Sequence, residues 1–131
     1  MRMSWTHIKS KDELEAFFKA ALPSIRQAAK DCGYAIGVHG SLRRDFDLIA
    51  VPWVENHANK DDLARAVHKA ICPYTMIKYD WEKKPLGRMA TVFPTCWIDP
   101  EMWDKIEPSL GHIDLSVVEL GGSTDTPGKK E

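Results

Sequence analysis

The chain has 131 residues, of which 44% are hydrophobic and 28% are charged, a balance typical of one globular domain. Its net charge of −1, with no run of basic residues, argues against a dedicated duplex-binding protein but leaves a local nucleic-acid patch open. The N-terminus lacks the apolar core of a signal peptide and no apolar run is long enough to cross a membrane, so we expect a cytoplasmic protein with no membrane partner.

The first predicted element is a long helix that begins after Ser10. Ser10 and Glu13 form the S-x-x-E pattern of a capping box, directly before an apolar stripe that starts at Leu14. Pro23 is expected to kink this helix or to split it in two, because proline removes a backbone donor. Gly33 is the predicted helix stop.

Two strands, over 34–40 and 45–53, are predicted next, and a second helix follows them. Asn59 is its predicted N-cap and Pro73 its end. Within this helix Asp61 and Arg65 have the i,i+4 spacing of an ion pair. His68 falls on the polar side of the helix, where we expect it to be solvated.

The remaining strands are predicted over 74–81, 88–94 and 112–120, with the turn sequence E-K-K-P-L-G between the first two. Residues 95–111 form an insertion with a short helix. Its side chains Trp97, Met102 and Trp103 either dock it onto the sheet or meet a partner. The chain from 1 to 120 is expected to be one domain, and residues 121–131 a disordered tail.

The fold class that follows is α/β in the broad sense, or α+β. We expect a mixed, twisted and largely antiparallel sheet of about five strands, with the helices packed on one face. The three cysteines, Cys32, Cys72 and Cys96, have no C-x-x-C pair and no histidine at zinc-finger spacing. We therefore expect free thiols, which suit a reducing cytosol.

Asp45 and Asp47 stand one residue apart at the start of the 45–53 strand, so their side chains project from the same face. Carboxylates held ~6–7 Å apart repel one another, and a divalent cation such as Mg²⁺ would relieve that repulsion. Gly40 permits a tight turn, and Ser41 offers a hydroxyl and an N–H to an anion. The pattern predicts a site for phosphate and metal, but an ordinary β-hairpin turn is equally compatible with the bare G-S-x-x-x-D-x-D spacing.

Asp114 is a third carboxylate, near the start of an otherwise apolar strand, where burial is costly unless the group is paired or binds a metal. If the 112–120 strand pairs beside the 45–53 strand, Asp114 comes close to the first two carboxylates. Lys84 and Arg88 flank the later turn, where they either face a phosphate or are simply solvated.

These residues resemble the nucleotidyltransferase superfamily, which includes DNA polymerase beta and the minimal nucleotidyltransferases. The resemblance covers residues 10–120 and rests on H-G-S near the end of one strand, D-x-D on the next and a later single Asp. GVHGSLRRDFDLIAVPW with the distal IDLSVV is, more narrowly, similar to small proteins of bacteriophages and prophages, which implies the cytoplasm of a bacterial host.

The resemblance implies that Gly40 and Ser41 bind nucleotide phosphate and that Asp45, Asp47 and Asp114 hold Mg²⁺ or Mn²⁺. It also implies transfer of a nucleoside monophosphate from a nucleoside triphosphate to an acceptor. The family usually places a helix between G-S and D-x-D, whereas here only Leu42, Arg43 and Arg44 intervene. Arg43 and Arg44 would then supply the positive charge that this helix provides elsewhere.

The shortened loop also supports an alternative function. A catalytically degenerate nucleotidyltransferase-like protein would act by binding a nucleotide or a host protein, in counter-defence or host takeover. For the enzyme, we expect no helical substrate domain after the core, so acceptor choice would depend on the 95–111 insertion, a second subunit or a partner protein.

Overall fold

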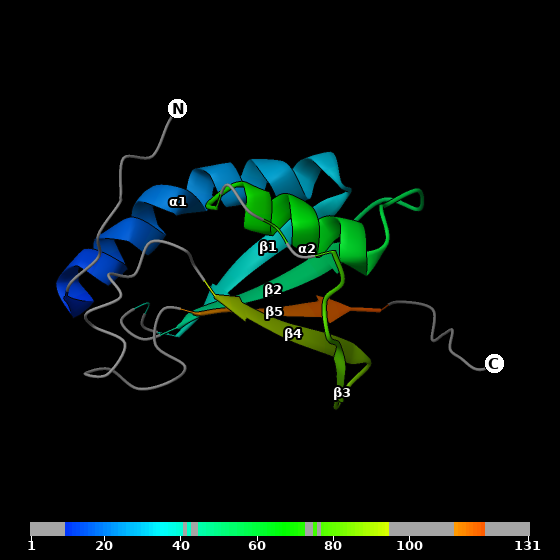
Figure 1. The fold of residues 1–131 in the computed structure, drawn as a ribbon. Coiled ribbons are helices and arrows are strands. Elements are labelled where there is room, and N and C mark those ends of the chain that lie inside the picture. Colours follow the sequence, from blue (N-terminus) through cyan, green and yellow to red (C-terminus); the bar gives the residue numbers. More distant parts are fainter. Residues whose placement is uncertain are drawn as a thin grey trace.

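The computed structural model describes residues 10–40, 42, 45–72, 75, 77–94 and 112–119 of the chain. Two helices and five strands lie within these ranges. They are α1 (Lys11–Asp31), β1 (Tyr34–His39), β2 (Phe46–Pro52), α2 (Lys60–Lys69), β3 (Glu82–Lys84), β4 (Arg88–Pro94) and β5 (His112–Val118). The strands form one sheet, and both helices cover the same face of it (Figure 1). The predicted α+β architecture, with helices on one face of a mixed sheet, is confirmed.

The strand order β1-β2-β5-β4-β3 places the last strand in the middle of the sheet. β5 pairs parallel with β2 and antiparallel with β4, and the two outer pairs, β1 with β2 and β3 with β4, are antiparallel. The sheet is therefore largely antiparallel, as expected from the short connections that join β1 to β2 and β3 to β4. The expected pairing of the 112–120 strand beside the 45–53 strand is confirmed.

The long N-terminal helix begins as the capping box predicts. The Ser10 hydroxyl oxygen accepts a hydrogen bond from the Glu13 N–H at 3.1 Å. α1 then runs without interruption through Pro23, so of the two predicted alternatives, a kink or a division, the division into two helices is wrong. Its apolar stripe is buried over the sheet, and this packing offsets the donor that proline removes. The buried side chains are Leu14, Phe17, Phe18, Ala21, Ile25 and Ala29.

Asn59 caps α2 as predicted, with its side-chain oxygen accepting from the Asp62 N–H at 2.8 Å. The predicted Asp61–Arg65 pair is wrong, because Arg65 binds Asp62 instead at 3.0 Å. Asp61 accepts a hydrogen bond from the indole N–H of Trp81 at 2.7 Å. A charged side chain on a helix can pair with a neighbour at i+3 or at i+4. Here Asp61 is bonded to Trp81, and Arg65 pairs with Asp62 at the i,i+3 spacing.

His68 is buried, with 4% of its surface exposed, so the predicted solvated position is wrong. Its Nδ1 lies 3.0 Å from the Tyr79 hydroxyl, and its ring centroid lies 4.4 Å from that of Phe93 on β4. The polar atoms of a histidine can enter a core when a partner satisfies them. Tyr79, which lies outside the helix, supplies that partner here.

The prediction of a strand over 74–81 is wrong for the described residues in that range, 75 and 77–81, none of which lies in a strand. Three contacts with side chains of α2 hold this segment: Arg65 donates to the carbonyl of Ile77, the Tyr79 hydroxyl lies beside His68, and Trp81 donates to Asp61. These contacts direct the segment toward the helix and away from β4. Strand β3 begins only at Glu82, inside the predicted turn, while the strand predicted over 88–94 is confirmed as β4.

The cysteines also differ from expectation. Cys32, at the C-cap of α1, is a free thiol, but Cys72, just beyond α2, is disulfide-bonded, so the prediction of free thiols is wrong for that residue. Sequence spacing does not indicate which sulfur atoms a fold brings together. The predicted helix and apolar cluster of the 95–111 insertion and the predicted tail at 121–131 lie outside the described residues. No helix among the described residues is long and apolar enough to span a bilayer.

Gly33 provides a test of how the chain turns from α1 into β1. Its φ of +88° is a left-handed conformation, and a Cβ there would lie 2.8 Å from Val54 Cγ2 and 2.9 Å from the Cα of His57. We expect Gly33→Ala to lower the free energy of unfolding by about 1–3 kcal/mol, measured by urea denaturation. Gly37→Ala is the matched control, because its nearest contact is 3.9 Å away, and it should change stability by less than about 1 kcal/mol. Equal losses in both variants would contradict the role given to Gly33.

Candidate functional site

The site begins with the register of the central strands. In the parallel pair, Asp47 of β2 lies opposite Asp114 of β5. In the antiparallel pair on the other side, His39 of β1 lies opposite Asp47. Residues that oppose each other across a sheet project from the same face, so these three side chains form a row across three strands.

The alternation of each strand decides which face carries this row. Phe46, Leu48 and Ala50 on β2 are buried, as are Ile113 and Leu115 on β5, and these residues face the two helices. Asp47 and Asp114 fall between them in sequence and therefore project from the opposite face, which neither helix covers. The carboxylates are accordingly half-buried, in contact with both the sheet and solvent.

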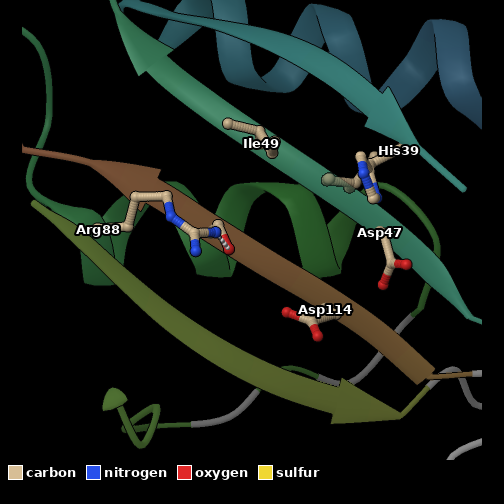
Figure 2. A pocket seen from close by; sticks show the side chains of 7 residues that line it. His39, Asp47, Ile49, Arg88 and Asp114 are labelled. Carbon is tan, nitrogen blue, oxygen red and sulfur yellow. Dashed lines mark hydrogen bonds between the residues drawn. The ribbon is translucent and has the colours of Figure 1, made fainter. Parts of the chain in front are cut away.

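A cavity of about 330 Å³ lies over this face. Figure 2 shows Asp47 and Asp114 projecting into the same space from adjacent strands, with Arg88 of β4 further along the sheet. Arg88 Nη1 donates a hydrogen bond to the Ser116 hydroxyl at 3.3 Å, which fixes the guanidinium group at the wall of the cavity. The lining residues are His39, Asp47, Leu48, Ile49, Arg88, Asp114 and Ser116.

The environment of the two aspartates disfavours their ionisation. Burial raises the pKa of Asp47, and the negative charges of Asp114 and Asp45 raise it further, against a smaller opposing effect of His39. Burial also raises the pKa of Asp114, although the positive charges of Lys84 and Arg88 act in the opposite direction. Two carboxylates in this situation would be stabilised by an added cation.

The residues present fit a hard cation that the protein holds through few ligands. Asp45 Oδ1 is buried and has no hydrogen-bond partner, so it has an unused acceptor. Gly40 leaves space beside the site, because a Cβ at that position would lie 3.2 Å from Asp47 Oδ2. Among the described residues, no group of three or more His, Cys, Asp or Glu side chains is arranged to hold a metal ion. Mg²⁺ commonly uses one or two carboxylates and completes its shell with water and phosphate oxygens.

The structure therefore brings together only part of the predicted site. Asp47, Asp114 and Arg88 line one cavity, and Gly40 lies beside Asp47. Lys84 acts on Asp114 through its charge and forms an ion pair with Glu82 at 3.3 Å. Asp45 is not among the residues that line the cavity, so its role as a third metal ligand stays a prediction. Ser41, Arg43 and Arg44 lie outside the described residues.

Four lining residues were not predicted as site residues from the sequence: His39, Leu48, Ile49 and Ser116. Ile49 and Ser116 stand two positions after Asp47 and Asp114, so strand alternation alone could have placed them on the same face. Placing His39 beside the carboxylates required knowledge of the β1–β2 register, which pairs it with Asp47.

Comparisons of the chain with protein-family models, with curated proteins and with solved structures give no match. The geometry and chemistry of the cavity that Asp47 and Asp114 line therefore carry the functional interpretation.

The raised carboxyl pKa values predict how stability depends on pH. A carboxyl whose pKa is higher in the folded chain binds protons more tightly when folded, so its ionisation at neutral pH costs stability. That cost disappears as the pH falls below the ordinary carboxyl pKa of about 4. We expect Asp114→Asn to unfold at higher urea concentration than the wild type at pH 7 in EDTA, with the difference shrinking as the pH is lowered toward 4.

Asp80→Asn is the control for this measurement, because Asp80 is exposed and lies away from the cavity. It should change stability by less than about 0.5 kcal/mol at either pH. If Asp114→Asn instead lowers stability at pH 7 without metal, Asp114 is a structural hydrogen-bond acceptor and not one of two repelling carboxylates.

Proposed function

We propose that this protein is a nucleotidyltransferase of the minimal type, dependent on Mg²⁺ or Mn²⁺, with a nucleoside triphosphate as donor. The observation that carries the proposal is the register pair Asp47–Asp114 on the face of the sheet that neither described helix covers. Two carboxylates that resist ionisation, in a cavity with a fixed guanidinium group, suit a bound metal and a polyphosphate together. The nucleotidyltransferase-like fold is part of this proposal.

Asp47 and Asp114 would hold the metal, with Asp45 as a third ligand. When bound, the metal would neutralise charge on the phosphates and polarise the α-phosphoryl group. Arg88 and Lys84 place positive charge beside Asp114 and would contact phosphate oxygens. Gly40 would let the chain approach the ligand next to Asp47, and Ser41, Arg43 and Arg44 would complete the anion site.

The reaction that these groups would support is a displacement at the α-phosphorus. An acceptor hydroxyl oxygen forms a bond to that phosphorus while the bond to the bridging oxygen of the β-phosphate breaks, and pyrophosphate leaves. Asp114, which lies opposite Asp47 in the site, would take the hydroxyl proton. The acceptor is left open: a protein, an RNA end and a small molecule all carry suitable hydroxyl groups.

Transfer of an α-phosphate label tests this activity. The protein is incubated with each of the four α-³²P nucleoside triphosphates, with Mg²⁺ or Mn²⁺ and with a bacterial lysate that supplies acceptors. We expect labelled product with the wild type and a loss of at least about 100-fold for Asp47→Asn and for Asp114→Asn. Asp80→Asn is the control and should transfer label like the wild type.

Thermal melts with EDTA and with millimolar Mn²⁺ supply a readout that does not need the acceptor. A ligand that binds only the folded chain raises its melting temperature. Mn²⁺ should therefore stabilise the wild type more than either aspartate variant. Label transfer that persists in both variants, or a wild type that Mn²⁺ does not stabilise, would contradict the proposed roles.

A second candidate function is nucleotide or host-protein binding without transfer. It is favoured by the metal-ligand geometry, because the described residues form no group of three ligands and Asp45 lies outside the cavity lining. If the ligand is a nucleotide, a nucleoside triphosphate should raise the melting temperature equally with and without Mn²⁺, and no label should be transferred. If the ligand is a host protein, neither the nucleotide nor Mn²⁺ should stabilise the chain, and again no label should be transferred. The same two measurements therefore separate the candidates.

A further inference from the structure

Within the part of the chain that the structure describes, the outer edge of β1 is an unpaired sheet edge. β1 is the first strand in the order β1-β2-β5-β4-β3 and pairs only with β2 among the described strands. The Trp53 N–H donates to the Gly33 carbonyl at 3.0 Å, which makes Gly33 and Trp53 a hydrogen-bonded pair of the antiparallel ladder. Because such pairs alternate, the N–H and C=O groups of Tyr34, Ile36 and Val38 point away from β2. Proline at position 52, opposite Tyr34, agrees with this assignment.

The two edges of the sheet differ in how they are protected against pairing with another chain. β3, at the far edge, has 3 residues, all of them charged, Glu82, Lys83 and Lys84. Short, charged strands resist edge-to-edge association. β1 has 6 residues, YAIGVH, with neither proline, lysine nor a carboxylate. It is therefore the edge that can accept a further strand.

A cavity of about 290 Å³ lies at the N-terminal half of this edge. Arg26 and Lys30 line it from α1, on the helix-covered side of the sheet. Ala35 and Ile36 are consecutive in β1 and project from opposite faces, yet both line the cavity. The cavity therefore lies against residues 34–36 of the edge strand, beside which an added chain would lie. The remaining lining residues are Tyr34 and Trp53.

The chemistry of this cavity defines what it can accept. Arg26 and Lys30 are both exposed, and neither forms an ion pair with a described residue. The cavity lining includes no carboxylate among the described residues. Trp53 is 60% exposed and offers an aromatic surface next to these cations. The combination suits a ligand with a negative charge and an apolar side chain close together.

We propose that the β1 edge is a docking site for an extended, acidic peptide segment of a partner protein. The segment adds as a strand beside β1, exchanging main-chain hydrogen bonds with Tyr34, Ile36 and Val38. One of its carboxylates meets Arg26 and Lys30, and a neighbouring apolar side chain packs on Trp53. The site is separate from the carboxylate cavity, where β1 contributes only His39, and it does not depend on nucleotidyl transfer.

Selection from a displayed library of random decapeptides on the immobilised full-length protein tests the docking site. Enriched peptides should carry acidic residues that alternate along the peptide with β-branched or aromatic residues. A synthetic copy of an enriched peptide should bind the double variant Arg26→Glu, Lys30→Glu at least about tenfold more weakly than the wild type. Lys69→Glu, an exposed charge reversal on α2, is the matched control and should bind normally. A library that yields no acidic peptide, or binding that the double variant retains, overturns the proposal.

Amide hydrogen exchange followed by NMR tests the geometry of docking. Without peptide, the amides of Tyr34, Ile36 and Val38 should exchange faster than those of Ala35 and Gly37, which bond to β2. Peptide binding should slow the first group selectively. If the first group is already protected in the free protein, through a second copy or another segment of this chain, then the edge is occupied and the proposal fails. Analytical ultracentrifugation identifies a second copy as the occupant.

Discussion

The parallel pairing of β2 with β5 is the constraint on which the other features depend. β5 enters the centre of the sheet, where one of its faces must be buried against α1 and α2. Ile113, Leu115 and Val117 occupy that face and are almost fully buried. A slip of one residue would turn them toward solvent and place Asp114 in the core. The hydrophobic face of β5 therefore determines the position of a carboxylate on the other face, directly opposite Asp47.

This arrangement has an electrostatic cost that the rest of the fold offsets. Asp47 and Asp114 resist ionisation because they are partly buried and lie near other carboxylates. β4 and β3 extend the sheet on the side of Asp114 and bring the positive charges of Arg88 and Lys84 toward it. A site that is anionic at its centre and cationic at its border is suited to a metal together with a phosphorylated ligand.

β1 borders both of the cavities for which we propose ligands. Its C-terminal residue, His39, lines the carboxylate cavity, whereas its N-terminal half borders the cavity formed with Arg26, Lys30 and Trp53. β1 can serve both because a strand at the edge of a sheet has an exposed face and an exposed row of main-chain groups. A partner docked along this edge would lie next to the carboxylate site without occupying it.

The sequence alone determined the features that depend on neighbouring residues. The caps at Ser10 and Asn59, the turn at Gly33 and the alternation around Asp47 and Asp114 follow from local hydrogen bonds, backbone sterics and the period of a strand. Only the tertiary structure decided which carboxylates face each other, where His68 finds its partner and why residues 77–81 follow α2 and not β4. Each of these depends on contacts between segments far apart in the chain, whose register is set by burial and packing that local periodicity does not encode.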